Sequence, residues 1–192
     1  MLHRLLVLCF LLPLTALAQS QTHGAFELGA VVGGTSGQSY GPDRASLGVR
    51  FGYSGSTSAN EQHFLVTAAE AELNWISGGK VPTTTVGGQA IQAMFGFRMG
   101  LRGKKNGVTL KLRPGFLSFH DALSPTGSAS RRLTLPLVET GLVYERYFNL
   151  HWAMRLDAGF PYVFYPGTDI LGKSSRSSIG NSQYSAGLTY RF

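Results

Sequence analysis

Cysteine, charged residues and long apolar runs are all scarce in this chain of 192 residues. The single cysteine, Cys9, lies in the N-terminal segment, so the rest of the chain can form neither a disulfide framework nor a thiolate metal site. Beyond that segment, no stretch approaches the roughly twenty continuous apolar residues of a membrane-spanning helix. Only 14% of the residues are charged and 25 are glycine, which is an unusual balance for a soluble globular protein.

The first residues have the pattern of a secretory signal peptide. An early arginine precedes an apolar run at 5–14, and Ala16 and Ala18 place small residues where a signal peptidase cleaves. The apolar run is too short to cross a bilayer as a helix. We therefore predict that 1–18 is a cleaved signal peptide and that 19–192 forms one domain.

Apolar side chains at every second position are what this chain has in abundance. In 89–102, for example, Phe95 and Phe97 alternate with Gly96 and Arg98. A period of two predicts strands with one apolar and one polar face, and membrane strands need roughly 9–11 residues. Eight segments carry the pattern. They are 25–33, 45–54, 63–76, 89–102, 108–119, 133–148, 152–161 and 184–192.

Eight strands, an even number, predict an antiparallel up-and-down barrel with no open sheet edge and both chain ends on one side. Tight turns are predicted at 103–107 and 149–151, on the side of the termini. The links on the other side are longer on the whole, as in transmembrane barrels. They are predicted at 34–44, 77–88, 120–132 and 162–182. Pro114 disagrees with a strand centre, because proline lacks a ladder donor.

Strand parity places the charged side chains opposite the aromatic and aliphatic ones. An eight-stranded barrel is just wide enough for side chains to fill it, and buried charges persist only when paired. Six acids and seven bases therefore predict a cross-linked polar core and not an open pore. The predicted inward polar network is Glu27, Arg50, Glu70, Glu72, Arg98, Lys111, Arg113, Glu139, Glu145, Arg155 and Asp157, with Arg102 and Arg191 on the same parity. Parity alone leaves open a soluble barrel with the opposite face inside.

The last nine residues alternate to the final position, with Tyr184, Leu188, Tyr190 and Phe192 on the apolar face. Such an ending resembles the signal by which the barrel-assembly machinery recognises its clients. With this ending and its eight alternating segments, 19–192 resembles the small outer-membrane β-barrel domain family of Gram-negative bacteria, which includes OmpA- and OmpX-type barrels. The Glu70-Ala-Glu72 ladder and the Lys111-Leu-Arg113-Pro-Gly-Phe116 strand also carry the resemblance.

The resemblance implies an integral protein of the cell outer membrane, surrounded by outer-membrane lipid and lipopolysaccharide and inserted by the barrel-assembly machinery. We expect it to be non-enzymatic, to need no cofactor, and to use its outer loops for envelope or surface interaction. Net positive outer connections would face lipopolysaccharide phosphates, and ordinary solvated loop charge is the alternative interpretation. Their bases are Arg44, Lys80, Arg131, Arg132, Lys173 and Arg176, against Asp43, Asp121 and Asp169. The formal charge of +7 lacks a basic helix or an RNA-binding aromatic motif, so no nucleic-acid partner is expected.

Two alternatives remain open. The first is a lipid A-modifying enzyme of the same fold, because Ser118 and His120 share a strand face and can approach each other. The His-then-Ser pattern of barrel-type deacylases is absent, however. The second is a soluble periplasmic lipocalin-like barrel that binds a small apolar ligand. No metal site is expected, because the remaining histidines show no close ligand spacing. Within 19–192 they are His23, His63 and His151.

Overall fold

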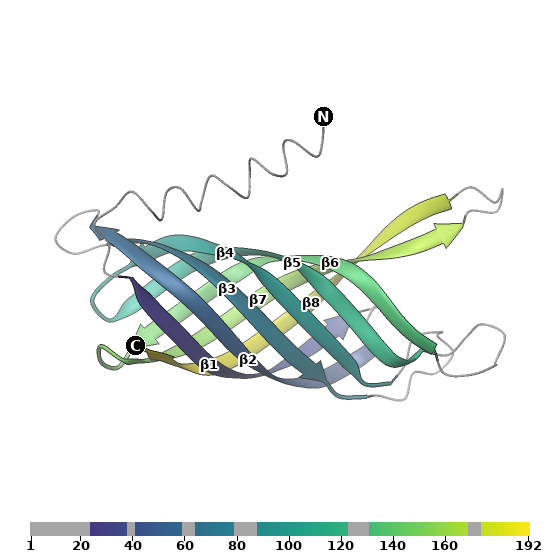
Figure 1. Ribbon diagram of the computed structural model, residues 1–192, viewed down its shortest axis with the longest axis horizontal. Helices are drawn as coiled ribbons and strands as arrows, with labels where there is room; N and C mark the ends of the chain where they lie inside the picture. Colours follow the sequence, from purple (N-terminus) through teal and green to yellow (C-terminus); the bar gives the residue numbers. More distant parts are fainter. Residues whose placement is uncertain (1–23, 38–40, 59–63, 79–87, 123–130, 169–173) are drawn as a thin grey trace.

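The computed structural model describes residues 24–37, 41–58, 64–78, 88–122, 131–168 and 174–192. In this part of the chain, eight strands form a closed barrel (Figure 1). They are β1 (Ala25–Gly37), β2 (Gly41–Ser58), β3 (Phe64–Ile76), β4 (Ala90–Arg102), β5 (Asn106–Ala122), β6 (Arg131–Tyr147), β7 (Trp152–Thr168) and β8 (Ser174–Arg191). The predicted signal peptide, 1–18, lies outside the described residues.

Each strand pairs in antiparallel fashion with its neighbours in the chain, and β1 closes the barrel by pairing with β8. The closing ladder runs from Glu27↔Arg191 to Gly37↔Asn181. The predicted fold class, an eight-stranded antiparallel up-and-down β-barrel, is therefore confirmed. The start of β1 and the end of β8 lie together at what we call the terminal end of the barrel. The opposite end, where β1 leads to β2, is called the loop end (Figure 1).

The turn between β6 and β7, at the terminal end, is closed by its own side chain. The Asn149 carboxamide oxygen accepts hydrogen bonds from the backbone N–H groups of His151, at 2.9 Å, and Trp152, at 2.8 Å. Asparagine favours turns because its side chain can bond the backbone two residues further on. The β4–β5 turn is also short, with the Gly103 N–H donating to the Asn106 carbonyl at 2.7 Å. Both tight turns lie where the sequence predicts them.

The strands are 13 to 18 residues long, and all but β3 and β4 extend further toward the loop end than the alternation predicts. β7 continues past 161 to Thr168, and β8 begins at Ser174 instead of 184. These extensions form a two-stranded hairpin that projects beyond the barrel wall (Figure 1). Backbone pairing needs no alternation of hydrophobicity, so polar residues at 174–182 can belong to a strand without showing its pattern. The predicted links at 34–44 and 162–182 were accordingly too long.

Of the five prolines that lie within strands, Pro114 and Pro161 each interrupt the ladder on one side only. Pro114 pairs with Val138 of β6, whereas the β4–β5 register is broken between Met94↔Gly115 and Phe97↔Leu112. Pro161 likewise pairs with β6, while the β7–β8 register is broken beside it. Because a proline removes one N–H donor, each costs part of one ladder and leaves the strand intact. Pro114 therefore lies within β5 and does not end the strand.

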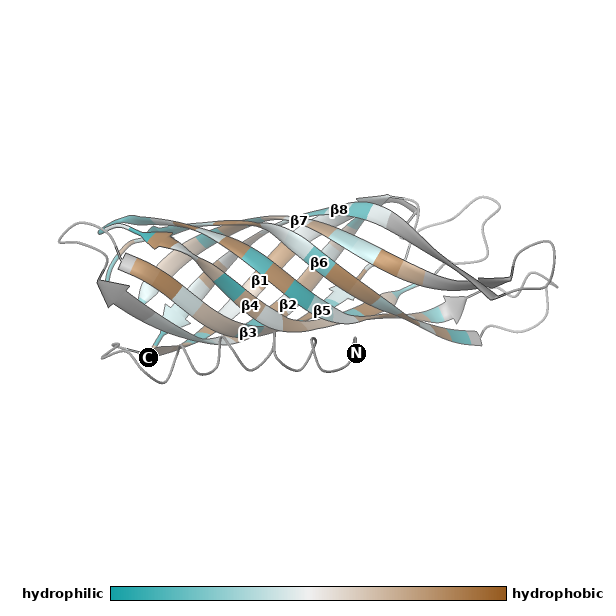
Figure 2. Cartoon of the chain, turned by 90° about the horizontal axis from the view of Figure 1, so that it is seen from above, coloured by the Kyte–Doolittle hydropathy of each residue, from teal (hydrophilic) through white to brown (hydrophobic). Residues whose placement is uncertain are grey.

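Successive side chains point alternately into and out of the barrel, as the two-residue period requires. Hydrophilic and hydrophobic bands consequently alternate along the strands (Figure 2). Charged residues of the strand centres are buried inside, and large apolar residues are exposed outside. Within the part of the chain that the structure describes, no helix is long and apolar enough to span a bilayer.

Inward-facing glycines leave room for long charged side chains. Gly141 of β6 pairs with Gly159 of β7. A Cβ atom added at Gly159 would overlap the Glu139 carboxylate, and one added at Gly141 would meet the Lys111 side chain and the backbone of β7. The glycines on this face are therefore determined by the space that the interior charges occupy.

We expect Gly159→Val to lower the free energy of unfolding by about 1–3 kcal/mol, because the added methyl groups displace the Glu139 carboxylate. Ala158→Val is the matched control, since Ala158 points outward on the same strand. Urea unfolding of the protein refolded in detergent micelles, followed by tryptophan fluorescence, measures both variants. Equal unfolding midpoints for the two variants would contradict this account of the interior.

Candidate functional site

The barrel interior contains a continuous set of buried ion pairs, which we call the ion-pair network. Its acids are Glu27, Glu70, Glu72, Glu139, Glu145 and Asp157, and its bases are Arg50, Arg98, Lys111, Arg113, Arg155 and Arg191. Each of these side chains is at most 6% exposed. The structure thus places all eleven residues of the predicted inward polar network in one cluster, together with Arg191.

Arg113 is the most highly connected base near the middle of the network. Its guanidinium lies 2.5 Å from the Glu139 carboxylate, 2.7 Å from that of Glu72 and 3.2 Å from that of Glu70. Arg155 bridges Glu70, at 2.7 Å, and Asp157, at 2.8 Å. These contacts join strands on opposite sides of the barrel, because Glu70 lies in β3 and Arg155 in β7. The network therefore fills the central cross-section.

The terminal end of the network is closed by Arg98, which reaches Glu27 at 2.5 Å and Glu145 at 2.9 Å. Arg191 also pairs with Glu27, at 2.8 Å, so the closing strands β1 and β8 are joined by charge as well as by backbone. The Tyr147 hydroxyl donates a hydrogen bond to the Glu145 carboxylate.

The Tyr147 ring lies between two guanidinium groups at the same end. The Arg102 Cζ atom is 3.9 Å from the ring centroid and that of Arg191 is 4.6 Å away. This stack closes the interior toward the termini, and it was not predicted. Its signal in the sequence is that Tyr147 shares the parity of Glu145.

The prediction of a polar interior is wrong at the loop end, where one side of the interior is apolar. The apolar cluster consists of Ile76, Ala90, Met94, Leu117, Phe119, Leu135, Leu137 and Val163, from β3 to β7. The facing side, on β1, β2 and β8, is polar instead. Thr35, Arg44, Ser46 and Gln183 are buried there. Charge pairing is needed only where charges are buried, and on this side of the loop end apolar side chains pack against one another instead.

The prediction that Arg44 lies in an outer loop is also wrong. It lies in β2, is only 2% exposed, and donates from Nη1 to the Gly88 carbonyl at 2.7 Å. Of the other predicted outer-loop charges, Lys80, Lys173 and Asp169 fall outside the described residues, whereas Arg132 is exposed at the start of β6.

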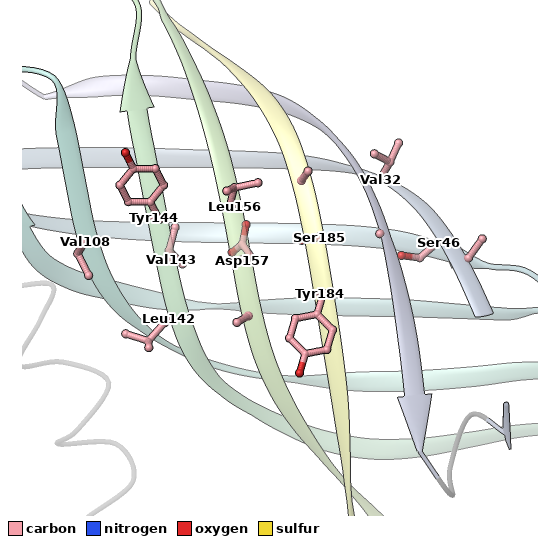
Figure 3. Close-up of a pocket in the computed structure, with 14 residues that line it drawn as sticks. Val32, Ser46, Val108, Leu142, Val143, Tyr144, Leu156, Asp157, Tyr184 and Ser185 are labelled. Atoms are coloured by element: carbon pink, nitrogen blue, oxygen red, sulfur yellow. The ribbon is translucent and has the colours of Figure 1, made fainter. Parts of the chain in front are cut away.

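The outer surface of the barrel is apolar over its whole middle section. Leu110 is 65% exposed, Met99 58% and Leu47 57%, and many other large apolar side chains are similarly open. Shallow grooves run between them. Figure 3 shows one groove, around which Leu142, Tyr144, Leu156 and Tyr184 lie, with the small Ala158 and Ala186 also lining it. The lining also includes Ser46, Asp157 and Ser185, but their side chains are buried, so the groove presents mainly apolar surface and suits a hydrocarbon chain.

Aromatic side chains gather on the outer surface at the terminal end. Trp152 contacts Tyr190 with ring centroids 4.9 Å apart, and Tyr190 contacts Phe192 at 5.1 Å. Phe26 and Tyr53 form a further pair at 5.0 Å. Of the residues predicted to form the barrel-assembly signal, Tyr184, Leu188 and Phe192 are exposed on the outside of the barrel and Tyr190 is half-buried in this aromatic group.

Ser118 and His120, the candidate catalytic pair, lie on β5 near the loop end and face outward. The Ser118 hydroxyl is 3.0 Å from the Thr134 hydroxyl on β6. The His120 backbone N–H donates to the Gln89 carbonyl at 3.0 Å. Both line a groove whose described lining contains no carboxylate. Among the described residues, no group of three or more histidine, cysteine, aspartate and glutamate side chains is arranged to hold a metal ion.

Comparison with known proteins gives matches among solved structures only. No protein-family model and no curated protein matches the chain. The attachment invasion locus protein Ail of Yersinia pestis matches with 11% identity over 90% of this chain and 100% of that one, at a TM-score of 0.46. The N-terminal β-barrel domain of Pseudomonas aeruginosa OprF matches with 13% identity, 90% and 100% coverage, and the same TM-score.

Neisserial surface protein A matches with 15% identity over 88% of this chain and 97% of that one, also at a TM-score of 0.46. At TM-scores below 0.5, none of these likenesses bears on what this chain does. The function proposed below therefore rests on the barrel's own interior and surface.

We expect Arg113→Met to lower the free energy of unfolding by about 3–5 kcal/mol, because it leaves several buried carboxylates short of a cation. Lys104→Met is the control, since Lys104 is exposed in the β4–β5 turn, and we expect a change within about 0.5 kcal/mol. Urea titration in detergent micelles measures both. If the two variants unfold at the same urea concentration, the network does not stabilise the barrel as described.

Proposed function

We propose that this protein is an integral outer-membrane β-barrel whose apolar outer surface contacts lipid and whose interior is closed at its centre by a polar plug. One observation carries the proposal: the polarity of the barrel is the reverse of that of a soluble protein. Paired charges fill the centre, while large aliphatic and aromatic side chains cover the outside. A monomeric soluble protein rarely exposes a contiguous apolar patch larger than a few hundred Å².

The same observation argues against the soluble lipocalin-like alternative. A barrel that stores a small apolar ligand needs an apolar cavity, whereas Arg113 and Arg155 occupy the central cross-section with their carboxylate partners. The apolar cluster at the loop end is packed, with Leu117, Phe119 and Val163 fully buried. Lipid is the solvent that suits the exposed face, because closure of the sheet leaves no unpaired strand edge in contact with hydrocarbon.

Aromatic side chains at both ends of the apolar belt support this orientation in a bilayer. Tyr53, Tyr144 and Trp152 lie toward the terminal end, and Trp75 and Tyr162 toward the loop end. Such girdles lie at the two membrane–water interfaces of outer-membrane barrels. With its short turns, the terminal end faces the periplasm, and the loop end faces outward toward lipopolysaccharide.

In this proposal, the barrel-assembly machinery inserts the chain and contacts the outward residues of β8. The protein carries out no reaction, and its loop end serves envelope or surface interaction. The Ser118 contact with Thr134 and the lack of a carboxylate in the described lining of the groove support this part. Release of acyl chains from lipid A by the purified protein, abolished in His120→Ala, would favour the lipid A-modifying alternative.

A charge placed on the outer face separates a lipid environment from water. We expect Leu112→Arg, in the middle of the apolar belt of β5, to destabilise the protein in lipid vesicles by about 2–4 kcal/mol. Leu150→Arg makes the same chemical change in the β6–β7 turn, where the side chain is 83% exposed, and we expect little effect. Urea unfolding from vesicles, with retention after carbonate washing as a parallel assay, measures both.

The proposal would be wrong if the wild-type protein left the vesicles on carbonate washing. It would also be wrong if Leu112→Arg and Leu150→Arg were equally stable, because water solvates an exposed arginine on a soluble barrel at almost no cost.

A further inference from the structure

A groove of about 280 Å³ lies on the outside of the barrel at the loop end, and we call it the rim groove. It crosses β3, β4, β5 and β6 and is lined mainly by side chains of the outward face. The lining residues are Trp75, Gln89, Ala90, Ile91, Phe116, Ser118, His120 and Arg132. In contrast to the apolar grooves of the middle section, this one combines apolar, hydroxyl and cationic side chains.

The lining changes from apolar to polar along the barrel axis. Ile91 and Phe116, which are 49% and 47% exposed, continue the apolar belt. Ile91 pairs with Ser118 of β5, and Ser118 pairs with Thr134 of β6, so a row of hydroxyls follows. His120 comes next, beyond this row. One molecule in the groove would therefore meet hydrocarbon at one end and polar groups at the other.

The polar edge is held by contacts between strands. The Trp75 indole N–H points to the Gln89 side-chain oxygen at 3.5 Å, and the His120 backbone is bonded to the Gln89 carbonyl at 3.0 Å. The β5–β6 register shifts between Phe119 and Ala122, at the position of His120. Register irregularities of this kind redirect side chains and often lie beside binding sites.

Arg132 gives the rim groove a positive charge, and none of the described lining residues is an acid. Arg132 is exposed, and within the part of the chain that the structure describes no acid pairs with it. This differs from the interior, where every base of the ion-pair network has a carboxylate partner. An arginine fork binds phosphate through two parallel hydrogen bonds, and hydroxyl and imidazole groups add donors.

We propose that the rim groove binds the phosphorylated head of lipid A, the lipid that anchors lipopolysaccharide in the outer leaflet. The phosphate contacts Arg132 and His120, with the Ser118 and Thr134 hydroxyls beside it, and an acyl chain follows Ile91 and Phe116 toward the middle of the belt. The apolar continuation selects a lipid over free phosphate. This inference rests on the proposed function, because it requires the loop end to lie in the outer leaflet.

The test is a titration of the protein, refolded in neutral detergent micelles, with bisphosphorylated lipid A, following the midpoint of thermal unfolding. A ligand that binds only the folded state raises this midpoint. We expect Arg132→Gln to weaken the apparent affinity about tenfold, as the loss of a charged hydrogen-bonding partner implies. The control is Lys105→Gln, which removes one exposed charge at the terminal end and should bind like wild type.

Further titrations separate the possible causes of the rise in the unfolding midpoint. Dephosphorylated lipid A should bind the wild type as weakly as lipid A binds Arg132→Gln, and inorganic phosphate at the same concentration should not raise the midpoint. Arg132→Lys, which keeps the charge but loses the fork, should be intermediate, and it replaces Arg132→Gln if that variant does not refold. A midpoint raised equally by inorganic phosphate would show a site for the free anion, and would overturn the lipid assignment.

Equal affinity of lipid A for Arg132→Gln and Lys105→Gln would overturn the site itself. Retention in vesicles after carbonate washing keeps this failure distinct from a failure of the proposed function. If the rim-groove assignment is wrong, the wild-type protein is still fully retained in the vesicles. If the barrel does not belong in lipid, the protein is lost from the vesicles whichever residue is at position 132.

Discussion

The requirement that buried charges be paired determines the rest of this barrel. Each carboxylate of the ion-pair network lies within reach of a cation from another strand, and the pair of Arg50 with Asp157, for example, joins β2 to β7. Such pairs persist only if the sheet is closed, because an open sheet would expose them to water. Closure brings Glu27 of β1 to Arg191 of β8. Inward glycines, such as Gly159 beside Glu139, make the space that these long side chains need.

Because charged side chains fill the centre of the barrel, the apolar side chains of the same strands lie on the outside. The two-residue alternation along each strand therefore determines both the inner and the outer surface. The outside then varies along the barrel axis. It is purely apolar around Leu112 and Phe95, aromatic at the terminal end around Tyr190, and mixed with hydroxyl and cationic groups at the rim groove. This order follows that of a bilayer, from hydrocarbon to interface to charged head group. The hairpin of β7 and β8 continues beyond it.

Much of this arrangement could be predicted from the sequence, because a two-residue period is visible without knowledge of contacts. It gave the number of strands, the two tight turns and the inward charges. It could not give the pairing partners, since Arg155 and Glu70 are 85 residues apart and only the register brings them together. The apolar cluster was missed because Leu117 and Phe119 have the same parity as the inward charges Lys111 and Arg113, so the inward face of β5 changes from polar to apolar along the strand. Strand ends rich in glycine and serine, as at 174–182, look like loops because they show no alternation.

The central claim is that hydrocarbon surrounds the outer face, and the depth profile of that face tests it most directly. Spin labels can be attached to single cysteines placed at Ala93, Phe95, Phe97, Met99 and Leu101 of β4, with Cys9 replaced by serine. In lipid vesicles, the account predicts that accessibility to oxygen relative to a water-soluble nickel complex is highest for the central labels and falls toward both ends. A uniform profile, with every label open to the nickel complex, would contradict it.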